Sequence, residues 1–444
     1  MSMLAVSLST ATAKRSAASG FHTAFIVAWV FCLLFYFMEY AVRSAPSVML
    51  PELTRSFRLS TVGVSSLLGL YYYSYAAFAI IAGASVDRWG AKYTIPVGVV
   101  LLALGTAMFG FGSSEIASVG RFLQGAGAAF AFVAAVYLAS HGLPARYLAT
   151  AIGITQCVGM LGGTAGGLVA APLIHGPMTW QHLWIDAGFV TLFIAIAMFI
   201  ATPRENQSSV AKVSIWKTFA PYKVVLRNPQ SYLCGLCGGL LFLPTTVGDM
   251  TWGVAFLRDG WHLGYAQAVD RAAMVPLGWV FGCPIMGYVA DRLGRRKPVI
   301  LAGAALMLAA AAGIFYFPPG TFPPYMLAFL LGFGSGAAMI PYSIIKEVNP
   351  DEAKGSATGA MNFLVFVISA LAAPAIGWWL QKLAGGGPLT LEVFSKAGSV
   401  YVAAVAIAAI LAVFLKETGS AVRRGALDVM AADQSVSQPR VPSG

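Results

Sequence analysis

A polar face runs along an otherwise apolar stretch near the start of the chain. Glu39 and Arg43 lie four positions apart within residues 21–48. Tyr36 and Tyr40 continue the same spacing of three and four, which places side chains along one side of a helix. A guanidinium there can hold a carboxylate through two parallel hydrogen bonds, while a carboxyl group can hold a proton or an amine. The alternative is that Glu39 and Arg43 form a private ion pair near the outer surface.

Two further ionisable residues stand inside apolar stretches, Arg121 in residues 115–141 and Asp249 in residues 229–256. A charge near the centre of a bilayer costs on the order of 3 kcal/mol, so each is a candidate functional group if these stretches span a membrane. Glu39, Arg121 and Asp249 are the candidates for proton coupling. The alternatives are an Arg121 whose charged end reaches the outer interface, and an Asp249 that is only a helix-end residue.

Uncharged side chains complete the candidate binding site. Gln156 and Asn362 occupy matching positions in the two halves of the chain, which suits a two-sided site. An acid facing Arg43 from the other half would also suit a zwitterion, with its carboxylate on Arg43 and its ammonium on Asp249. The expected substrate-binding residues are Tyr36, Glu39, Arg43, Tyr75, Gln156, Asp249, Trp252 and Asn362.

The composition indicates the kind of scaffold that must position these groups. Of the 444 residues, 58% are hydrophobic and 10% are charged, and the mean hydropathy is +0.75. A membrane span needs roughly 20 mainly apolar residues. We therefore expect an all-α integral membrane protein with twelve transmembrane helices, and neither a soluble enzyme nor a nucleic-acid binder. All five cysteines lie inside apolar runs, so no disulfide framework is indicated.

The charged residues indicate the topology. With the amino terminus inside, the cytoplasmic segments hold 20 of the 28 basic residues, which predicts that both termini are cytoplasmic. This asymmetry also explains the net charge of +11 better than a nucleic-acid partner does. The expected organisation is a cytoplasmic tail (1–19), a six-helix bundle (20–202), a cytoplasmic linker (203–228), a second six-helix bundle (229–416) and a cytoplasmic tail (417–444).

The two halves carry an internal repeat. The segment GASVDRWGAK begins at Gly83, and GYVADRLGRRK begins 204 positions later at Gly287. Gln156 and its neighbours are echoed around Asn362 at an offset of 206. Two matches at nearly one offset indicate two related halves, as in many membrane carriers.

The repeated segment resembles the signature of the major facilitator superfamily, G-x-x-x-D-[RK]-x-G-[RK]-[RK]. The resemblance implies two pseudo-symmetric six-helix halves and a conformational switch at this motif. Asp87 and Asp291 can pair with a nearby arginine or approach the positive end of a helix, and the glycines can allow close helix approach or a tight turn. A plain basic loop is the alternative. The expected switch residues are Gly83, Asp87, Arg88, Gly90, Lys92, Gly287, Asp291, Arg292, Gly294 and Arg295.

Finer resemblances concern the substrate. The stretch from Glu39 and Arg43 to Asp87 and Arg88 resembles, in its spacing, the organic-anion symporter branch, in which an arginine at the position of Arg43 binds the substrate anion. Arg121 and Gly125 resemble the R-x-x-x-G signature, in which the arginine is tied to proton coupling. Thr246 stands where organophosphate exchangers carry a second arginine, which disfavours a phosphate substrate. The segments around Trp252 and Asn362 also resemble bacterial uptake carriers of the phagosomal nutrient (amino-acid) transporter type.

These features together predict a secondary transporter, not an enzyme, that imports a small carboxylate-bearing solute, such as an amino acid or organic acid, with protons. Its partners would be the small-molecule substrate, protons and the lipid of a bacterial cytoplasmic (inner) membrane. It would act as a monomer without cofactor, metal or nucleic acid. An exporter, a carrier of iron chelates, and a non-transporting receptor on the same scaffold remain open.

Overall fold

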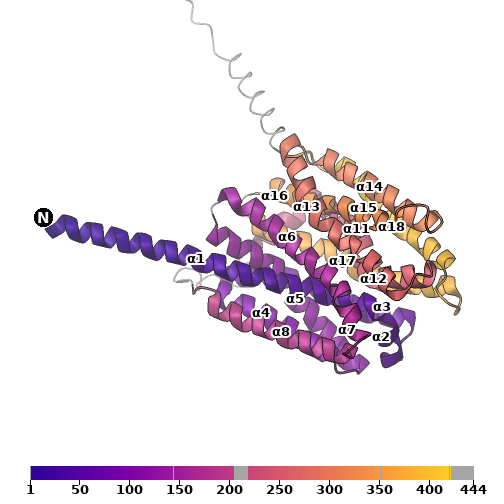
Figure 1. The fold of residues 1–444 in the computed structure, drawn as a ribbon. Coiled ribbons are helices and arrows are strands. Elements are labelled where there is room, and N and C mark those ends of the chain that lie inside the picture. Colours follow the sequence, from indigo (N-terminus) through magenta and orange to yellow (C-terminus); the bar gives the residue numbers. More distant parts are fainter. Residues whose placement is uncertain (1, 144, 205–218, 351–352, 420, 422–444) are drawn as a thin grey trace, which may run out of the picture.

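The computed structural model describes residues 2–143, 145–204, 219–350, 353–419 and 421 of the chain. Every regular element in this described part is a helix, and the expected all-α fold is confirmed. Figure 1 shows the helices of the amino-terminal half (indigo to magenta) beside those of the carboxy-terminal half (orange to yellow), with the first helix projecting from one end.

The amino-terminal half consists of six long helices and three short ones. Residues 2–19, expected as a tail, continue the first long helix. The elements are α1 (Ser2–Ser44), η1 (Ala45–Val48), α2 (Leu50–Phe57), α3 (Thr61–Trp89), α4 (Ala91–Phe109), α5 (Ser114–Gly142), α6 (Ala145–Leu168), α7 (Ala170–Ile174) and α8 (Trp180–Ala201).

The carboxy-terminal half has more broken helices. The segment between the halves contains α10 (Ala220–Arg227). The elements of the carboxy-terminal half are α11 (Pro229–Leu243), the π-helices η2 (Pro244–Gly253) and η3 (Phe256–Gly260), α12 (Tyr265–Ala272), α13 (Met274–Leu293), α14 (Lys297–Tyr316), α15 (Met326–Ser335), η4 (Gly336–Met339), α16 (Ile340–Glu347), α17 (Lys354–Ala384) and α18 (Leu391–Phe414). We call the end of the molecule at which α10 lies the linker end, and the opposite end the distal end.

Twelve helical segments of the described chain are long and apolar enough to cross a membrane, which confirms the expected number of spans. The apolar stretches 21–48, 115–141 and 229–256 correspond to the spans Thr23–Val48, Ser114–Gly142 and Pro229–Gly253, within three residues at each end. On α8, Phe193 and Ile200 expose 70% and 74% of their surface, as expected of side chains that face lipid. The starts of α3, α5, α8, α11 and α18 are capped by a side chain. At α3, for example, the Ser60 hydroxyl accepts a hydrogen bond from the backbone N–H of Gly63 at 3.2 Å.

Glycines allow the helices to pack closely. A Cβ atom at Gly125 on α5 would collide with the backbone carbonyl of Tyr71 on α3. A Cβ atom at Gly162 on α6 would collide with the carbonyl of Phe37 on α1. Small residues at such contacts bring helix backbones together. The glycine of the R-x-x-x-G segment, Gly125, therefore serves close helix packing.

The halves meet along α3 with α17 and along α6 with α13. At the distal end, the Tyr265 hydroxyl donates a hydrogen bond to the carbonyl oxygen of Val48 at 2.7 Å. Nearer the middle, the Tyr72 hydroxyl donates to the carbonyl oxygen of Thr246 at 2.8 Å. The Ser65 hydroxyl makes a third such bond between the halves. Hydrogen bonds therefore join the two halves from the distal end to the middle of the molecule.

Candidate functional site

A small cavity lies between the two halves. It is walled mainly by aromatic rings, with two amide side chains among them. Its lining residues come from α1, α3, α5 and α6 of one half and from α11, η4, α16 and α17 of the other: Tyr36, Tyr40, Tyr75, Phe132, Gln156, Phe242, Met339, Tyr342, Asn362 and Phe366. We call it the central cavity.

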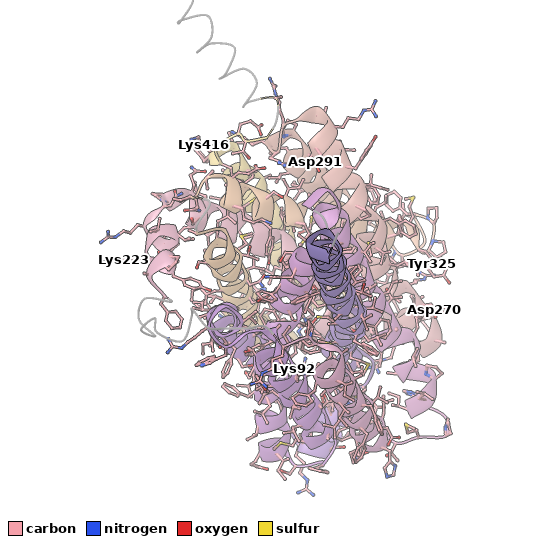
Figure 2. All side chains as sticks on the ribbon, turned by 90° about the vertical axis from the view of Figure 1, so that its left-hand side faces the viewer. Lys92, Lys223, Asp270, Asp291, Tyr325 and Lys416 are labelled. Carbon is pink, nitrogen blue, oxygen red and sulfur yellow. The ribbon has the colours of Figure 1, made fainter. Side chains whose placement is uncertain are left out.

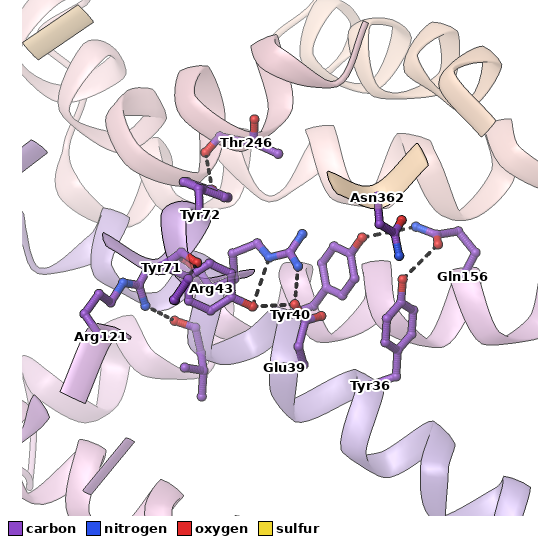
Figure 3. A network of polar contacts seen from close by, with 12 residues as sticks. Tyr36, Glu39, Tyr40, Arg43, Tyr71, Tyr72, Arg121, Gln156, Thr246 and Asn362 are labelled. Carbon is purple, nitrogen blue, oxygen red and sulfur yellow. Dashed lines mark hydrogen bonds and ion pairs between the residues drawn. The ribbon is translucent and has the colours of Figure 1, made fainter. Parts of the chain in front are cut away.

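The two amides of the central cavity come from matching positions in the halves. Gln156 accepts a hydrogen bond from the Tyr36 hydroxyl at 3.0 Å, and its amide nitrogen donates to the Tyr40 hydroxyl at 3.3 Å. Asn362 accepts from the Tyr342 hydroxyl at 2.7 Å, while its amide Nδ2 is buried without a partner. Figure 3 shows Gln156 and Asn362 near each other. Asn362 therefore has a free donor next to the cavity.

Glu39 and Arg43 lie behind the aromatic wall of the cavity. They form an ion pair one helical turn apart on α1, and their side chains are 0% and 1% exposed. Tyr71 donates a hydrogen bond to Glu39 Oε1 and accepts one from Arg43 Nε at 3.3 Å (Figure 3). The ion pair between Glu39 and Arg43, which is the alternative interpretation of these residues, is thus present, but it is fully buried and does not lie near a surface.

The Arg43 guanidinium is surrounded by rings that also line the central cavity. Its Cζ lies 4.3 Å from the ring centre of Tyr40, 5.3 Å from that of Tyr75 and 5.0 Å from that of Phe366. Such cation–π contacts stabilise a guanidinium away from water. Arg43 Nη1 and Glu39 Oε2 remain buried without a hydrogen-bond partner. One donor and one acceptor of the pair are therefore available to a ligand or a proton.

Arg121 on α5 fixes the end of α1. Its side chain is 2% exposed, so the alternative in which it reaches the interface is wrong. Its Nη1 donates to the carbonyl oxygen of Val42 at 3.1 Å and to Gln124 Oε1 at 2.7 Å, and its Nε donates to the carbonyl oxygen of Leu68 at 3.4 Å. Backbone carbonyls at the end of a helix lack partners within the helix. Arg121 therefore supplies hydrogen-bond donors to the backbone carbonyls at the point where α1 ends and η1 begins.

Asp249 and Trp252 do not lie at the central cavity. Both are on the π-helix η2 and line a separate cavity inside the carboxy-terminal half. The expectation that Asp249 faces Arg43 is therefore wrong for this conformation. In a π-helix the hydrogen bonds run from i to i+5, so side chains are rotated away from the positions that α-helical spacing predicts.

The turns of the repeated motif have the expected conformation. Gly90 and Gly294 have φ of 75° and 63°, which glycine adopts readily, so both tight turns are confirmed. The side chain of Asp87 lies outside the described part of the structure. The Arg88 guanidinium lies 5.7 Å from the ring centre of Trp89, and Lys92 donates a hydrogen bond to a backbone carbonyl of α8.

The second copy of the motif forms an ion-pair network at the linker end. Arg296 donates to the Asp291 carboxylate at 2.6 Å and to Glu347 of α16 at 3.0 Å. The expected pairing of Asp291 with a nearby arginine is confirmed, and the partner is Arg296, which is not among the expected switch residues. Burial disfavours the charged guanidinium, but these two hydrogen bonds outweigh burial and raise the pKa of Arg296. Figure 2 views the molecule from this end, with Asp291 near its edge.

Gly83 and Gly287, the two motif glycines that lie inside helices, differ in how closely a neighbouring helix approaches them. A Cβ atom at Gly83 would lie 3.1 Å from the hydroxyl of Tyr222 on α10, so the expected close approach is present there, although the neighbour is the linker helix. A Cβ atom at Gly287 would meet nothing within 4 Å. The prediction of close helix approach at Gly287 is therefore wrong for this conformation, because α13 has no close neighbour at that position.

Several residues of the site were not expected from the sequence. Tyr342 and Phe366 come from the carboxy-terminal half and reach the cavity only through the packing of α16 and α17 against α3 and α5. Tyr71 has a signal in the sequence, because it lies four positions before Tyr75 in a run of tyrosines. Arg296 follows the expected Arg295 directly and is part of the same basic cluster.

Residues 32–374 match the Major Facilitator Superfamily, and the chain belongs to this family. Family membership assigns it to the secondary transporters built from twelve membrane helices, and not to the enzymes.

Three known proteins illustrate the similarity. The membrane sensor protein UhpC of Salmonella typhimurium is 24% identical over 416 residues, which are 86% of this chain and 88% of the relative. The cis,cis-muconate transport protein of Acinetobacter baylyi is 24% identical over 413 residues, 88% of this chain and 95% of the relative. The solved structure of a bacterial homolog of the human lysosomal transporter Spinster, inward-facing and occupied, has a TM-score of 0.68 at 16% identity and covers 87% of this chain and 96% of its own. The structural likeness supports the fold.

Proposed function

We propose that this protein is a proton-coupled symporter that imports a small carboxylate-bearing solute, such as an organic acid or amino acid, by alternating access. The substrate would bind in the central cavity between the halves. The observation that carries the proposal is the buried pair of Glu39 and Arg43, which lies behind the wall of that cavity and keeps one unpartnered atom on each side chain. An ionisable pair within a membrane span is expensive to bury and is a functional feature by default.

The pair suggests how proton and anion are coupled. When Glu39 is ionised, it occupies the Arg43 guanidinium. A proton that binds Glu39 at Oε2 removes its charge and weakens the ion pair. The guanidinium then binds the substrate carboxylate by charge-assisted hydrogen bonds, with Nη1 already free of a partner. Release of the substrate and of the proton restores the pair.

The remaining candidate residues take supporting roles in this proposal. Tyr36, Tyr75, Gln156 and Asn362 would contact the uncharged part of the substrate from both halves. Arg121 would hold the end of α1 so that Arg43 keeps its position, and it would affect proton coupling through that contact. Asp249 and Trp252 are assigned no contact with this substrate.

Alternating access would rock the bundle 20–202 against the bundle 229–416, with 203–228 as the linker between them. The repeated motif would act as the switch at the linker end. The basic residues favour an inner-membrane protein with both termini in the cytoplasm, so the linker end would be cytoplasmic. We propose that the monomer is the functional unit.

The relatives are in keeping with this proposal. The Acinetobacter baylyi protein transports cis,cis-muconate, as its name states, and it is similar over 88% of this chain. The resemblance of the first span to organic-anion symporters points in the same direction, as does the resemblance to phagosomal nutrient carriers. A phosphate ester is disfavoured by Thr246, whose hydroxyl pairs with that of Ser369 at 2.9 Å inside the carboxy-terminal half.

The test is uptake into liposomes. The purified protein is reconstituted, an inward proton gradient is imposed, and uptake of labelled amino acids, monocarboxylates, dicarboxylates and phosphate esters is measured. We expect uptake of one carboxylate class that collapses with a protonophore. Release of preloaded solute under a reversed gradient, without uptake under an inward gradient, would replace the import proposal with export.

A second candidate function is that of a membrane receptor. It is favoured by the similarity to UhpC, which is named a membrane sensor protein. If the protein is a receptor, it binds the same carboxylates when purified in detergent but does not move them across the membrane of liposomes. Saturable binding combined with no uptake in either direction would support this candidate and overturn transport.

A further inference from the structure

A second cavity lies inside the carboxy-terminal half at its distal end. It is bounded by η2, η3, α12, α13, α14, α15, α17 and α18, and by the segments between η3 and α12 and between α14 and α15. None of its lining residues belongs to the central cavity. Its wall is mostly aromatic and aliphatic, and it includes two charged side chains, Asp249 and Arg271. We call it the distal cavity.

The two charges of the distal cavity are not paired. Within the part of the chain that the structure describes, neither Asp249 nor Arg271 forms an ion pair. The nearby Asp259, by contrast, pairs with Arg258 at 2.6 Å. An unpaired acid and an unpaired base on one apolar wall can receive opposite charges of a single ligand.

Three aromatic side chains of the same wall carry buried polar atoms without partners. They are Trp252 Nε1, Trp261 Nε1 and Tyr401 Oη. Trp252 and Tyr401 are each only 6% exposed, and buried indole and phenol groups normally find a hydrogen-bond partner. Their concentration around one cavity indicates that this cavity accommodates a polar group as well as an apolar body.

The local helix geometry brings these groups to the cavity. Asp249 and Trp252 both lie on η2, whose π-helical winding over Pro244–Gly253 departs from regular α-helix. Irregular π-helical turns are frequent at functional sites. A Cβ atom at Gly253 would lie 2.7 Å from Asp249 Oδ1 and 3.7 Å from the Cβ of Ala272, so α12 passes close to the carboxylate. Arg271 precedes Ala272 on that helix.

We infer that the distal cavity binds an aromatic zwitterion, a small molecule with an aromatic body, one ammonium group and one carboxylate. The ammonium binds Asp249, and the rings of Trp252 and Tyr401 add cation–π contact. The carboxylate binds Arg271, and the free indole N–H groups are additional donors. A purely anionic ligand would face Asp249, and a purely cationic one would face Arg271, so neither uses both charges. The site is separate from the proposed carboxylate site and does not depend on it.

Binding at the distal cavity acts on the contact between the halves. The same π-helix that carries Asp249 accepts the hydrogen bond from Tyr72 of the other half at the Thr246 carbonyl. A Cβ atom at Gly163 of α6 would lie 3.2 Å from Met250. A ligand that fixes η2 therefore favours one arrangement of the halves and changes the rate of transport.

The test is equilibrium binding of labelled tryptophan, phenylalanine and tyrosine to the purified full chain. We expect saturable binding of at least one of them, with displacement by tryptamine or indole-3-propionate at least tenfold weaker than by the parent zwitterion. This ligand comparison uses the wild-type protein and does not rely on the folding of a variant. No saturable binding of the three amino acids, or displacement by tryptamine as strong as by tryptophan, would overturn the inference.

Variants assign the binding to the distal cavity. Asp249→Asn and Arg271→Gln are each expected to weaken it at least tenfold, and Tyr401→Phe several-fold. Asp259→Asn is the matched control, because its carboxylate pairs with Arg258, and it should leave binding unchanged. Binding lost in Gln156→Ala but kept in Asp249→Asn would place the zwitterion in the central cavity and overturn the proposal.

Discussion

The guanidinium of Arg43 and the carboxylate of Glu39 pair with each other one helical turn apart on α1, fully buried behind the aromatic wall of the central cavity. The Tyr71 hydroxyl completes the arrangement by donating to Glu39 and accepting from Arg43. A buried ion pair adds little to stability, because desolvation of both charges offsets their attraction. We propose that its place beside a cavity between the two halves serves the exchange of partners during transport.

Replacement of the guanidinium tests its role as the substrate anchor. Arg43→Gln is expected to weaken binding of the transported carboxylate by roughly 30- to 150-fold, since hydrogen bonds to a charged group contribute about 2–3 kcal/mol. Arg43→Lys should recover only part of the loss, because an ammonium group cannot make the two parallel hydrogen bonds. Isothermal titration calorimetry measures both. The exposed Lys396, which pairs with Glu392 at 2.6 Å, supplies the control Lys396→Gln. Unchanged affinity in Arg43→Gln would remove the anchor role.

Protonation of Glu39 predicts a pH dependence of binding. Because the proton frees Arg43 for the anion, the affinity of the wild-type protein should rise as the pH falls, within the range in which the substrate remains ionised. Glu39→Gln cannot bind or release a proton, so its affinity should be nearly independent of pH in that range. Binding titrations at a series of pH values compare the two proteins. An equal pH dependence in both would place the coupling proton on another group.

The two amides of the central cavity are expected to contribute modestly and from opposite sides. Gln156→Ala and Asn362→Ala should each weaken substrate binding about 2- to 10-fold, the range of a neutral hydrogen bond. The hydrogen bonds of the two amides are made with tyrosines of their own halves. The losses of binding free energy in the two single variants should therefore add in the double variant, unless the substrate bridges both amides. If neither variant weakens substrate binding, this cavity is excluded as the substrate site.

The ion-pair network at the linker end is expected to govern cycling. Asp291→Asn removes the charge that Arg296 contacts at 2.6 Å, while the central cavity stays intact. Transport should slow several-fold while the equilibrium affinity changes by less than twofold. Uptake rates and binding on the same preparation separate the two effects, and Glu392→Gln at an exposed pair is the control. An equal loss of affinity and rate would argue against a purely conformational role.

Close helix packing predicts opposite effects of two glycine substitutions. Gly125→Ala should destabilise the protein by about 1–3 kcal/mol, because the new methyl group collides with the backbone of α3 at Tyr71. Gly153→Ala meets nothing within 4 Å and should be neutral or slightly stabilising, since alanine favours helix over glycine. Thermal denaturation of both variants in detergent measures the difference. A Gly125→Ala protein as stable as Gly153→Ala would contradict the close contact.

The parts of the site that the sequence predicts are those that depend on regular helices. The spacing of Glu39 and Arg43 on α1, and the matched offset of Gln156 and Asn362, place these pairs correctly because α-helical geometry and the repeat both hold there. Asp249 is misplaced, because its prediction rests only on a charge inside an apolar span, which does not say to which side of the helix the carboxylate points; on the π-helix η2 it lines the distal cavity.

Other features require the packed structure. Phe366 reaches the central cavity because α17 packs along α3 of the other half, and its ring lies 4.1 Å from that of Tyr75. No local pattern in the sequence encodes this contact. Arg296 is selected as the partner of Asp291, and not its neighbour Arg295, by the direction of the chain after the turn at Gly294.

The most direct test of the central claim measures proton and solute movement together. Wild-type protein and Glu39→Gln are reconstituted into liposomes with an internal pH dye, and uptake of the labelled carboxylate identified by the panel is followed under an inward proton gradient. The account predicts that the wild-type protein accumulates the solute while the interior acidifies. It predicts that Glu39→Gln still exchanges labelled for unlabelled solute but neither accumulates it nor carries protons. Accumulation and acidification by Glu39→Gln at the wild-type level would contradict the exchange of partners at Arg43.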